Sequence, residues 1–88
     1  MTFTDAPEQS FASSINDVLY NFVIKYNSRY DYWSMAISTD GAVLAAGVKL
    51  VTKTDLLKQY PSIPFEMRSE YKEDANGTNI TEFTITVT

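Results

Sequence analysis

The C-terminal end of the chain alternates between apolar and polar side chains with the period of a β-strand. Phe83, Ile85 and Val87 fall on one face of this segment, and Glu82 and three threonines fall on the other. Threonine, valine, isoleucine and the aromatic residues suit a pleated sheet, and together they make up 34 of the 88 residues. The composition therefore leans towards a β fold, and the last segment is predicted to be a strand.

Two dipeptides indicate tight hairpin turns. Asn76-Gly77 separates residues 65–72 from the C-terminal strand, and Asp40-Gly41 separates residues 32–38 from residues 42–51. Both dipeptides accept the positive φ angles of a type I′ turn. In residues 65–72, charged side chains alternate with mostly apolar ones, so we expect one face of that strand to contact water. The sequence therefore predicts two hairpins.

One short helix is expected between these two hairpins. Thr54 is a good N-cap, Lys58 lies near the predicted C-terminal end, and Pro61 stops the helix. The pattern predicts a single helical turn near residues 54–59.

Residues 8–26 fit two kinds of secondary structure. The helical interpretation places seven apolar residues on one face: Phe11, Ile15, Val18, Leu19, Phe22, Val23 and Tyr26. The strand interpretation places five residues of 18–26 on one face, after a turn at Asn16-Asp17: Val18, Tyr20, Phe22, Ile24 and Tyr26. Serine, asparagine, β-branched and aromatic residues are mediocre helix formers, so propensity slightly favours strands and leaves the helix open.

The length of the chain allows one domain. We assign residues 1–88 to it, with residues 1–7 as a flexible N-terminal arm. A domain of this size has a net stability of only a few kcal/mol, which makes dependence on partner proteins plausible. No apolar run approaches the roughly 18 residues of a membrane span, and residues 1–7 lack the order of a signal peptide. We expect a soluble protein that is not secreted by that route.

Histidine and cysteine are both absent from the chain. Most general-base, triad and zinc chemistry relies on imidazole or thiolate groups. We therefore expect no enzyme, no catalytic residue, no metal site and no cofactor. Acidic and amide side chains at residues 70–76 offer oxygen ligands for calcium, but they lack the spacing of an EF-hand loop and are typical of a solvated hairpin tip.

The balance of charge argues against a nucleic-acid partner. Seven Lys and Arg residues face eleven Asp and Glu residues, which gives a net charge of −4, and the cations are scattered along the chain. A net-negative domain without clustered cations repels phosphate. We expect protein partners instead.

The densest mixture of polar and aromatic side chains lies between Tyr26 and Trp33. Tyrosine, tryptophan and arginine dominate the energetics of interfaces. With the C-terminal strand, the candidates for a partner interface are Tyr26, Asn27, Arg29, Tyr30, Trp33, Phe83, Ile85 and Val87. The alternative is an internal role, in which Arg29 pairs with Asp31 or stacks on Trp33, and the tryptophan fills the core.

Five short motifs follow one another between residues 7 and 60. They are Pro7-Glu8-Gln9-Ser10-Phe11, Asn27-Ser28-Arg29, Trp33, Gly47-Val48-Lys49-Leu50 and Leu56-Leu57. In this order and spacing the chain resembles the baseplate plug family of contractile-tailed bacteriophages. The resemblance implies a predominantly β fold, which favours strands at residues 8–26, and it implies no chemistry. With it we expect an all-β fold, mainly antiparallel, as a small barrel or sandwich of about six strands.

The resemblance also implies a function and a location. A plug of this family is a structural virion protein at the centre of the tail baseplate, made in the host cytoplasm. Its partners would be hub, central spike and tube-proximal subunits, with the chain part of an oligomeric assembly and no membrane involved. The alternative is a small acidic soluble protein that binds or inhibits a host or phage protein, and a helix over residues 8–26 would favour it.

Overall fold

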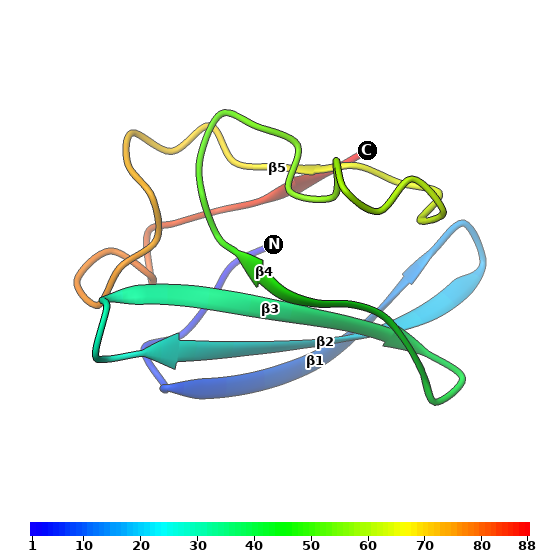
Figure 1. Ribbon diagram of the computed structural model, residues 1–88, viewed down its shortest axis with the longest axis horizontal. Helices are drawn as coiled ribbons and strands as arrows, with labels where there is room; N and C mark the ends of the chain where they lie inside the picture. The colour runs from blue at the N-terminus through cyan, green and yellow to red at the C-terminus, as the bar shows by residue number, and fades with distance from the viewer.

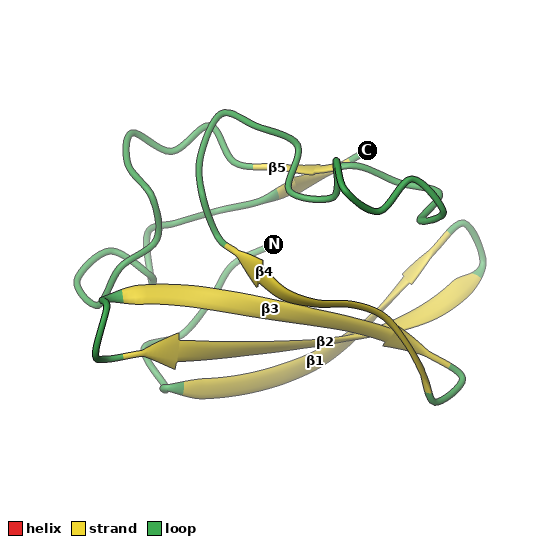
Figure 2. Cartoon of the chain, in the orientation of Figure 1, coloured by secondary structure: helices red, strands yellow, loops and turns green.

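The computed structural model describes every residue from Met1 to Thr88 and consists of strands and loops (Figures 1 and 2). The strands are β1 (Glu8–Ile15), β2 (Val18–Asn27), β3 (Tyr32–Thr39), β4 (Ala42–Lys49), β5 (Met67–Arg68) and β6 (Thr86–Val87). Strands β1 to β4 form one antiparallel sheet in chain order, and β5 and β6 form a second antiparallel pair. The all-β prediction is confirmed, with two open sheets in place of a closed barrel. No helix of the length and hydrophobicity needed to cross a membrane is present.

Residues 8–26 form two strands, which confirms the strand interpretation. Burial along β2 follows a period of two: Tyr20, Phe22 and Ile24 are buried, whereas Leu19 is 59% exposed. A helix would bury Leu19 together with Phe22, because residues three apart share a helix face. The aromatic and β-branched residues of this segment therefore adopt the strand conformation that their propensities favour.

Two type I′ turns connect the strands of the large sheet. Asn16 and Asp17 have φ angles of 52° and 66°, and Asp40 and Gly41 have φ angles of 50° and 76°. Both dipeptides form two-residue loops between adjacent strands, as the sequence predicts. The twist of this turn matches the twist of the flanking strands, so it sets the register of β1 on β2 and of β3 on β4.

The core lies between the large sheet and a second layer. From the sheet it receives Tyr20, Phe22, Ile24, Trp33, Met35 and Ile37. From the second layer it receives Leu56, Leu57, Ile63, Phe65, Met67, Phe83 and Ile85. Figure 1 shows the two layers, with β5 and β6 lying above the face of the large sheet. The face of the large sheet that points away from this layer has no covering element.

Backbone hydrogen bonds extend the small sheet on both sides. Beyond β6, Met1 and Ile85 bond to each other in both directions, at 3.0 and 3.1 Å. Beyond β5, the amides of Lys53 and Leu56 donate to the carbonyls of Ser69 and Met67. Residues 1–7, which the sequence suggests as a flexible arm, are thus attached at Met1, and Phe3 is buried.

The edge strand β4 is irregular. Its register on β3 shifts between Met35 and Ile37 and again between Ile37 and Ser38. Gly47 has a φ of 67°, a conformation that glycine adopts without steric cost. The hydroxyl of Tyr60 donates to the carbonyl of Ala46 at 3.3 Å and covers part of this edge. The edge of β4 is therefore bulged and partly covered.

The predicted helix near residues 54–59 is wrong. The segment forms successive turns, in which the amide of Lys58 donates to Asp55 and that of Tyr60 donates to Leu57. Asp55, not Thr54, caps the first turn, because its Oδ1 accepts from the amide of Leu57 at 3.0 Å. The amide of Leu56 bonds to β5 instead of to a helical carbonyl, so pairing with the small sheet replaces the helix.

The predicted tight turn at Asn76-Gly77 is also wrong, although the two arms do pair through β5 and β6. Residues 69–85 form the connection, and Asn76 holds a local turn in which its Oδ1 accepts from the amides of Thr78 and Asn79. Its carbonyl accepts from Trp33 Nε1 at 2.9 Å. The bond from Trp33 attaches Asn76 to the large sheet. The expected alternation survives, because Phe83 and Ile85 are buried while the threonines beside them are exposed.

Candidate partner interface

The β2–β3 loop presents two exposed side chains at one end of the sheet. Asn27 Oδ1 accepts from the amides of Arg29 and Tyr30, at 3.0 and 3.2 Å, which closes a tight loop. Tyr30 is 67% exposed, and the Arg29 guanidinium carbon lies 5.6 Å from the centre of its ring. We call Asn27, Arg29 and Tyr30 the loop surface.

Asp31 attaches this loop to the 74–79 segment. Its Oδ1 accepts from the hydroxyl of Tyr26 at 2.6 Å and from the amide of Gly77 at 2.7 Å. These two bonds hold the pKa of Asp31 below its ordinary value, and the same carboxylate raises the pKa of the Tyr26 hydroxyl. A side chain at position 77 would place its Cβ 2.6 Å from the Tyr26 oxygen, so only glycine allows this approach.

Three of the sequence candidates lie in the protein's own core. Trp33 is 2% exposed, donates from Nε1 to Asn76, and packs against the ring of Tyr26 with centroids 5.0 Å apart. Phe83 and Ile85 are equally buried. Trp33 thus has the internal role that the sequence suggests as its alternative. Phe83 and Ile85, expected only at an interface, are covered by the fold in the same way and present no surface to a partner. Tyr26, Asn27 and Val87 are half-buried.

The proposed internal partners of Arg29 are wrong. Asp31 bonds to Tyr26 and Gly77, and the ring beneath the guanidinium is that of Tyr30, not Trp33. Arg29 and Tyr30 are therefore available at the surface.

A second group of exposed apolar residues lies at the other end of the sheet, and sequence reasoning missed it. Val18, Leu19 and Val43 are 41%, 59% and 68% exposed. A hydrogen bond of 2.8 Å from Thr39 Oγ1 to the carbonyl of Leu19 joins the two turns beside them. We call Val18, Leu19 and Val43 the tip patch. Its signal in the sequence is two adjacent apolar residues directly after a turn, one of which must face outward in a strand.

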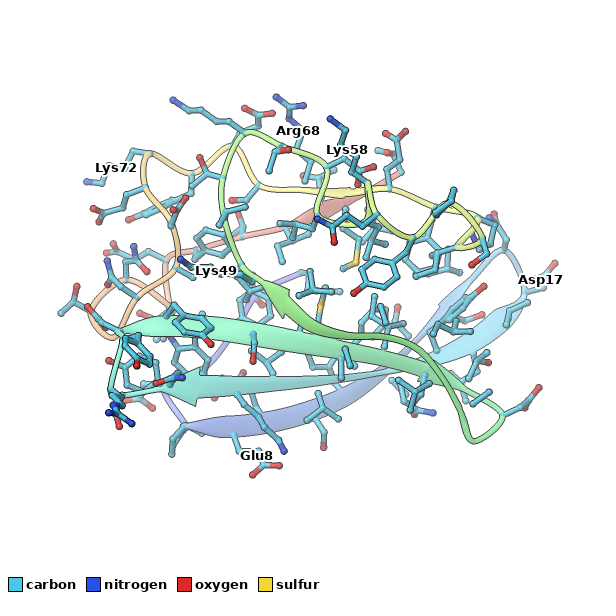
Figure 3. All side chains as sticks on the ribbon, in the orientation of Figure 1. Glu8, Asp17, Lys49, Lys58, Arg68 and Lys72 are labelled. Atoms are coloured by element: carbon cyan, nitrogen blue, oxygen red, sulfur yellow. The ribbon has the colours of Figure 1, made fainter.

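The outer face of the large sheet is almost free of charge. Its side chains on β1, β2 and β3 are mostly small: Ser10, Ala12, Ser14, Asn21, Val23, Ser34, Ala36 and Ser38. Charges lie in one row across the strands, where Glu8 and Lys25 pair at 3.8 Å and Lys49 follows beyond Ser34. In Figure 3, Lys58, Arg68 and Lys72 lie on the opposite side of the molecule, over the second layer. The outer face therefore suits an uncharged protein surface and not a phosphate backbone.

No three acidic side chains are grouped in a way that could hold a metal ion. The hollow beside β4 is lined by Lys49, Thr54, Asp55, Lys58 and Tyr60 among its ten residues. The geometry of the chain thus offers surfaces for contact with other proteins.

The comparisons with known proteins agree with this geometry. A family model described as "Cyanophage baseplate Pam3 plug gp18" matches residues 1–87. No curated protein matches the chain. The matched range includes all six strands and both layers.

Proposed function

The chain belongs to the cyanophage baseplate plug family, and from this membership we propose that it is a plug or hub component at the centre of a contractile tail baseplate. It would act by packing against hub and central spike subunits and would carry out no reaction. The observation that carries the proposal is the family match over residues 1–87, which extends over the whole fold and not over one motif.

The distribution of exposed side chains supports a role in holding neighbours together. The loop surface lies at the β2–β3 end of the large sheet, and the tip patch lies at the end that carries the two type I′ turns (Figure 1). These ends are separated along the molecule, whose longest dimension is 33 Å. Aromatic, arginine and aliphatic side chains are the usual anchors of protein interfaces. A chain with anchors at both ends can bridge two neighbouring subunits.

The alternative of a small acidic inhibitor receives no support from residues 8–26. A helix there would have favoured it, and the segment forms β1 and β2. The net charge of −4 remains compatible with it but is not specific, because acidic side chains are spread over both layers.

Deletion of the gene from the phage tests the proposed function. We expect lysates without the chain to lack complete contractile tails, and expression from a plasmid to restore them. Mass spectrometry of purified wild-type tails should find the chain at a fixed ratio to the other baseplate proteins. Infective, contractile particles formed without the chain would refute a structural role in the baseplate.

A further inference from the structure

The outer edge of β1 carries a row of backbone groups without partners. The carbonyl of Pro7 accepts from the amide of Tyr26 at 2.8 Å, which fixes the phase of the β1–β2 ladder. Because hydrogen bonding alternates along an antiparallel pair, the odd residues of β1 bond to β2 and the even ones point away. The residues that point away are Glu8, Ser10, Ala12 and Ser14. All four are exposed, and their amides and carbonyls form no hydrogen bond within the chain.

Nothing in β1 protects this edge. All eight of its residues pair with β2 in one uninterrupted register. Natural sheets protect their edges with lysine, proline or bulges, whereas the only charged residue of β1 is Glu8, at its start. The opposite edge is protected, because β4 has shifts in register, Gly47 at positive φ, and Tyr60 bonded to Ala46. The large sheet is therefore more readily extended at β1 than at β4.

A second unpaired backbone position faces the same space from the other layer. Thr88 and Glu66 bond to each other in both directions, and Ile85 bonds to Met1. By the same alternation, Val87 directs its amide and carbonyl away from β5, toward the side where Met1 lies. Neither group forms a hydrogen bond. A hollow of about 320 Å³ lies here. It is lined by Val87, by residues 11–13 of β1, and by Met1 and Thr2.

We propose that this hollow and the β1 edge receive an extended segment of a neighbouring baseplate subunit, which adds to the large sheet as a fifth strand. The proposal rests on the proposed function. A single extended segment has two free backbone edges, so it can pair with β1 on one side and approach Val87 on the other. A second copy of this chain cannot do so through its own β1, because β2 already occupies one edge of that strand.

The faces of β1 define the chemistry of the segment. Side chains of an added strand alternate between the same two faces as those of β1. On the inner face they would lie beside Phe11 and Ile15, which are half-buried, so apolar residues suit these positions. On the outer face they would lie beside Ser10, Ala12 and Ser14, so small uncharged residues suit the positions between. The occupant is therefore an extended segment with alternating apolar and small residues and without charge.

Cryo-electron microscopy of purified baseplates tests the proposal directly. We expect backbone density of another subunit about 4.8 Å from β1, in strand geometry, over at least residues 10–14. A β1 edge that faces solvent, a helix, or a second copy of this chain would overturn the strand addition. Baseplates that lack the chain altogether would overturn the proposed function itself, so the two failures are distinguishable.

A pair of lysine variants tests the same edge in the phage. Ala12→Lys places a charge at the edge, whereas Asn21→Lys places it on the paired residue of β2, on the same face but inside the sheet. In plasmid complementation of the deletion, we expect Ala12→Lys to lower incorporation into tails at least tenfold and Asn21→Lys to lower it much less. Equal incorporation of both variants, or an equal loss, would overturn the proposal.

A proline variant separates the edge from the stability of the chain. The Ala12 amide points away from β2, so Ala12→Pro removes one outward donor and no bond of the β1–β2 ladder. We expect the purified variant to keep a β-type circular dichroism spectrum and to be lost from tails at least tenfold. If the Ala12→Pro variant enters tails in the same amount as the wild-type chain, the proposal is overturned. If the variant does not fold, the comparison of Ala12→Lys with Asn21→Lys tests the proposal instead.

Discussion

At the scale of single residues, the loop surface depends on one carboxylate. Asp31 has a positive φ of 54° and accepts hydrogen bonds from both Tyr26 and Gly77. Aspartate and asparagine tolerate this conformation better than most residues, so the side chain fits both the loop and the contact. The loop that carries Arg29 and Tyr30 is thereby attached to the 74–79 segment, and a partner meets it already ordered, with less entropy to lose on binding.

The charge of Asp31 should make stability depend on pH. Its pKa is lowered from 3.8 in the folded chain, so its contribution to stability is complete above that value and is lost as the pH falls through the lowered pKa. Asp31→Asn keeps the shape of the side chain and removes this titration. We expect the melting temperature of the variant to lie below that of the wild type at pH 7 and the difference to shrink below pH 3.8.

Tyr26→Phe is the matched control, since it leaves the Gly77 bond to Asp31 intact. We expect Tyr26→Phe to lower the melting temperature at pH 7 by less than Asp31→Asn does. Because the pKa of Tyr26 is raised from 10.0 in the folded chain, its hydroxyl contributes stability that is complete below pH 10.0 and is lost as the pH rises through the raised pKa. The phenylalanine variant has no such dependence on pH. A difference between wild type and Asp31→Asn that is constant from pH 7 to pH 2 would contradict the assignment.

Alanine variants of Trp33 and Tyr30 should distinguish a residue that stabilises the fold from one that binds a partner. Trp33→Ala empties a buried site, and substitutions of this kind cost about 3–5 kcal/mol, comparable to the whole stability of a small domain. Tyr30→Ala removes a side chain that is 67% exposed and should change the unfolding free energy by less than about 0.5 kcal/mol. Urea denaturation measures both, and tail incorporation should fall for Tyr30→Ala although it folds. A stable Trp33→Ala variant would place the tryptophan outside the core.

At the scale of elements, the sequence correctly predicts the features that depend on neighbouring residues alone. The turns at Asn16-Asp17 and Asp40-Gly41 are local properties, and both are found as predicted. The period-two burial of Tyr20, Phe22 and Ile24 agrees with the strand interpretation, which propensity favoured only slightly over a helix. The type I′ turn predicted at Asn76-Gly77 and the helix predicted near residues 54–59 are not found, because long-range bonds to Trp33 and to β5 replace the expected local geometry. The tip patch and the free edge of β1 follow from strand order, which composition does not reveal.

The first type I′ turn provides a test at this scale. Asp17 has a φ of 66°, which a β-branched residue adopts only with a steric cost. We expect Asp17→Val to lower the unfolding free energy by about 1–2 kcal/mol, and Asp17→Gly to leave it unchanged or raise it slightly, because Asn-Gly is the preferred type I′ dipeptide. Urea denaturation compares the two variants, and a valine variant as stable as the glycine one would argue against this turn type.

At the scale of the whole molecule, the two layers depend on each other. The large sheet buries one face only, and the C-terminal segment contributes Phe83 and Ile85 to the core that covers it. Phe83 also contacts the rings of Phe3 and Tyr71, with centroids 6.5 and 6.0 Å apart. Neither layer has a core of its own, so we expect the chain to unfold in one cooperative transition.

Removal of residues 81–88 should therefore abolish the fold and not merely shorten it. Without Phe83 and Ile85 the inner face of the sheet is exposed, so we expect loss of near-ultraviolet circular dichroism and binding of a hydrophobic dye. Thr84→Ala, which changes an exposed residue of the same segment, should leave both measurements unchanged. A truncated chain with a cooperative melting transition would show that the large sheet is stable alone.

The pairing of Met1 with Ile85 has a consequence for the order of folding. The strands of the large sheet are joined by loops of two to four residues, whereas this pair is separated by 84 positions, so its closure carries the larger entropic cost and comes late. On the ribosome residues 81–88 also emerge after the strands of the large sheet. The hollow beside β1 is bordered by Val87 and exists only when that segment is in place. Assembly through this hollow would therefore select chains whose C-terminal segment has folded, and incompletely folded subunits would not be incorporated.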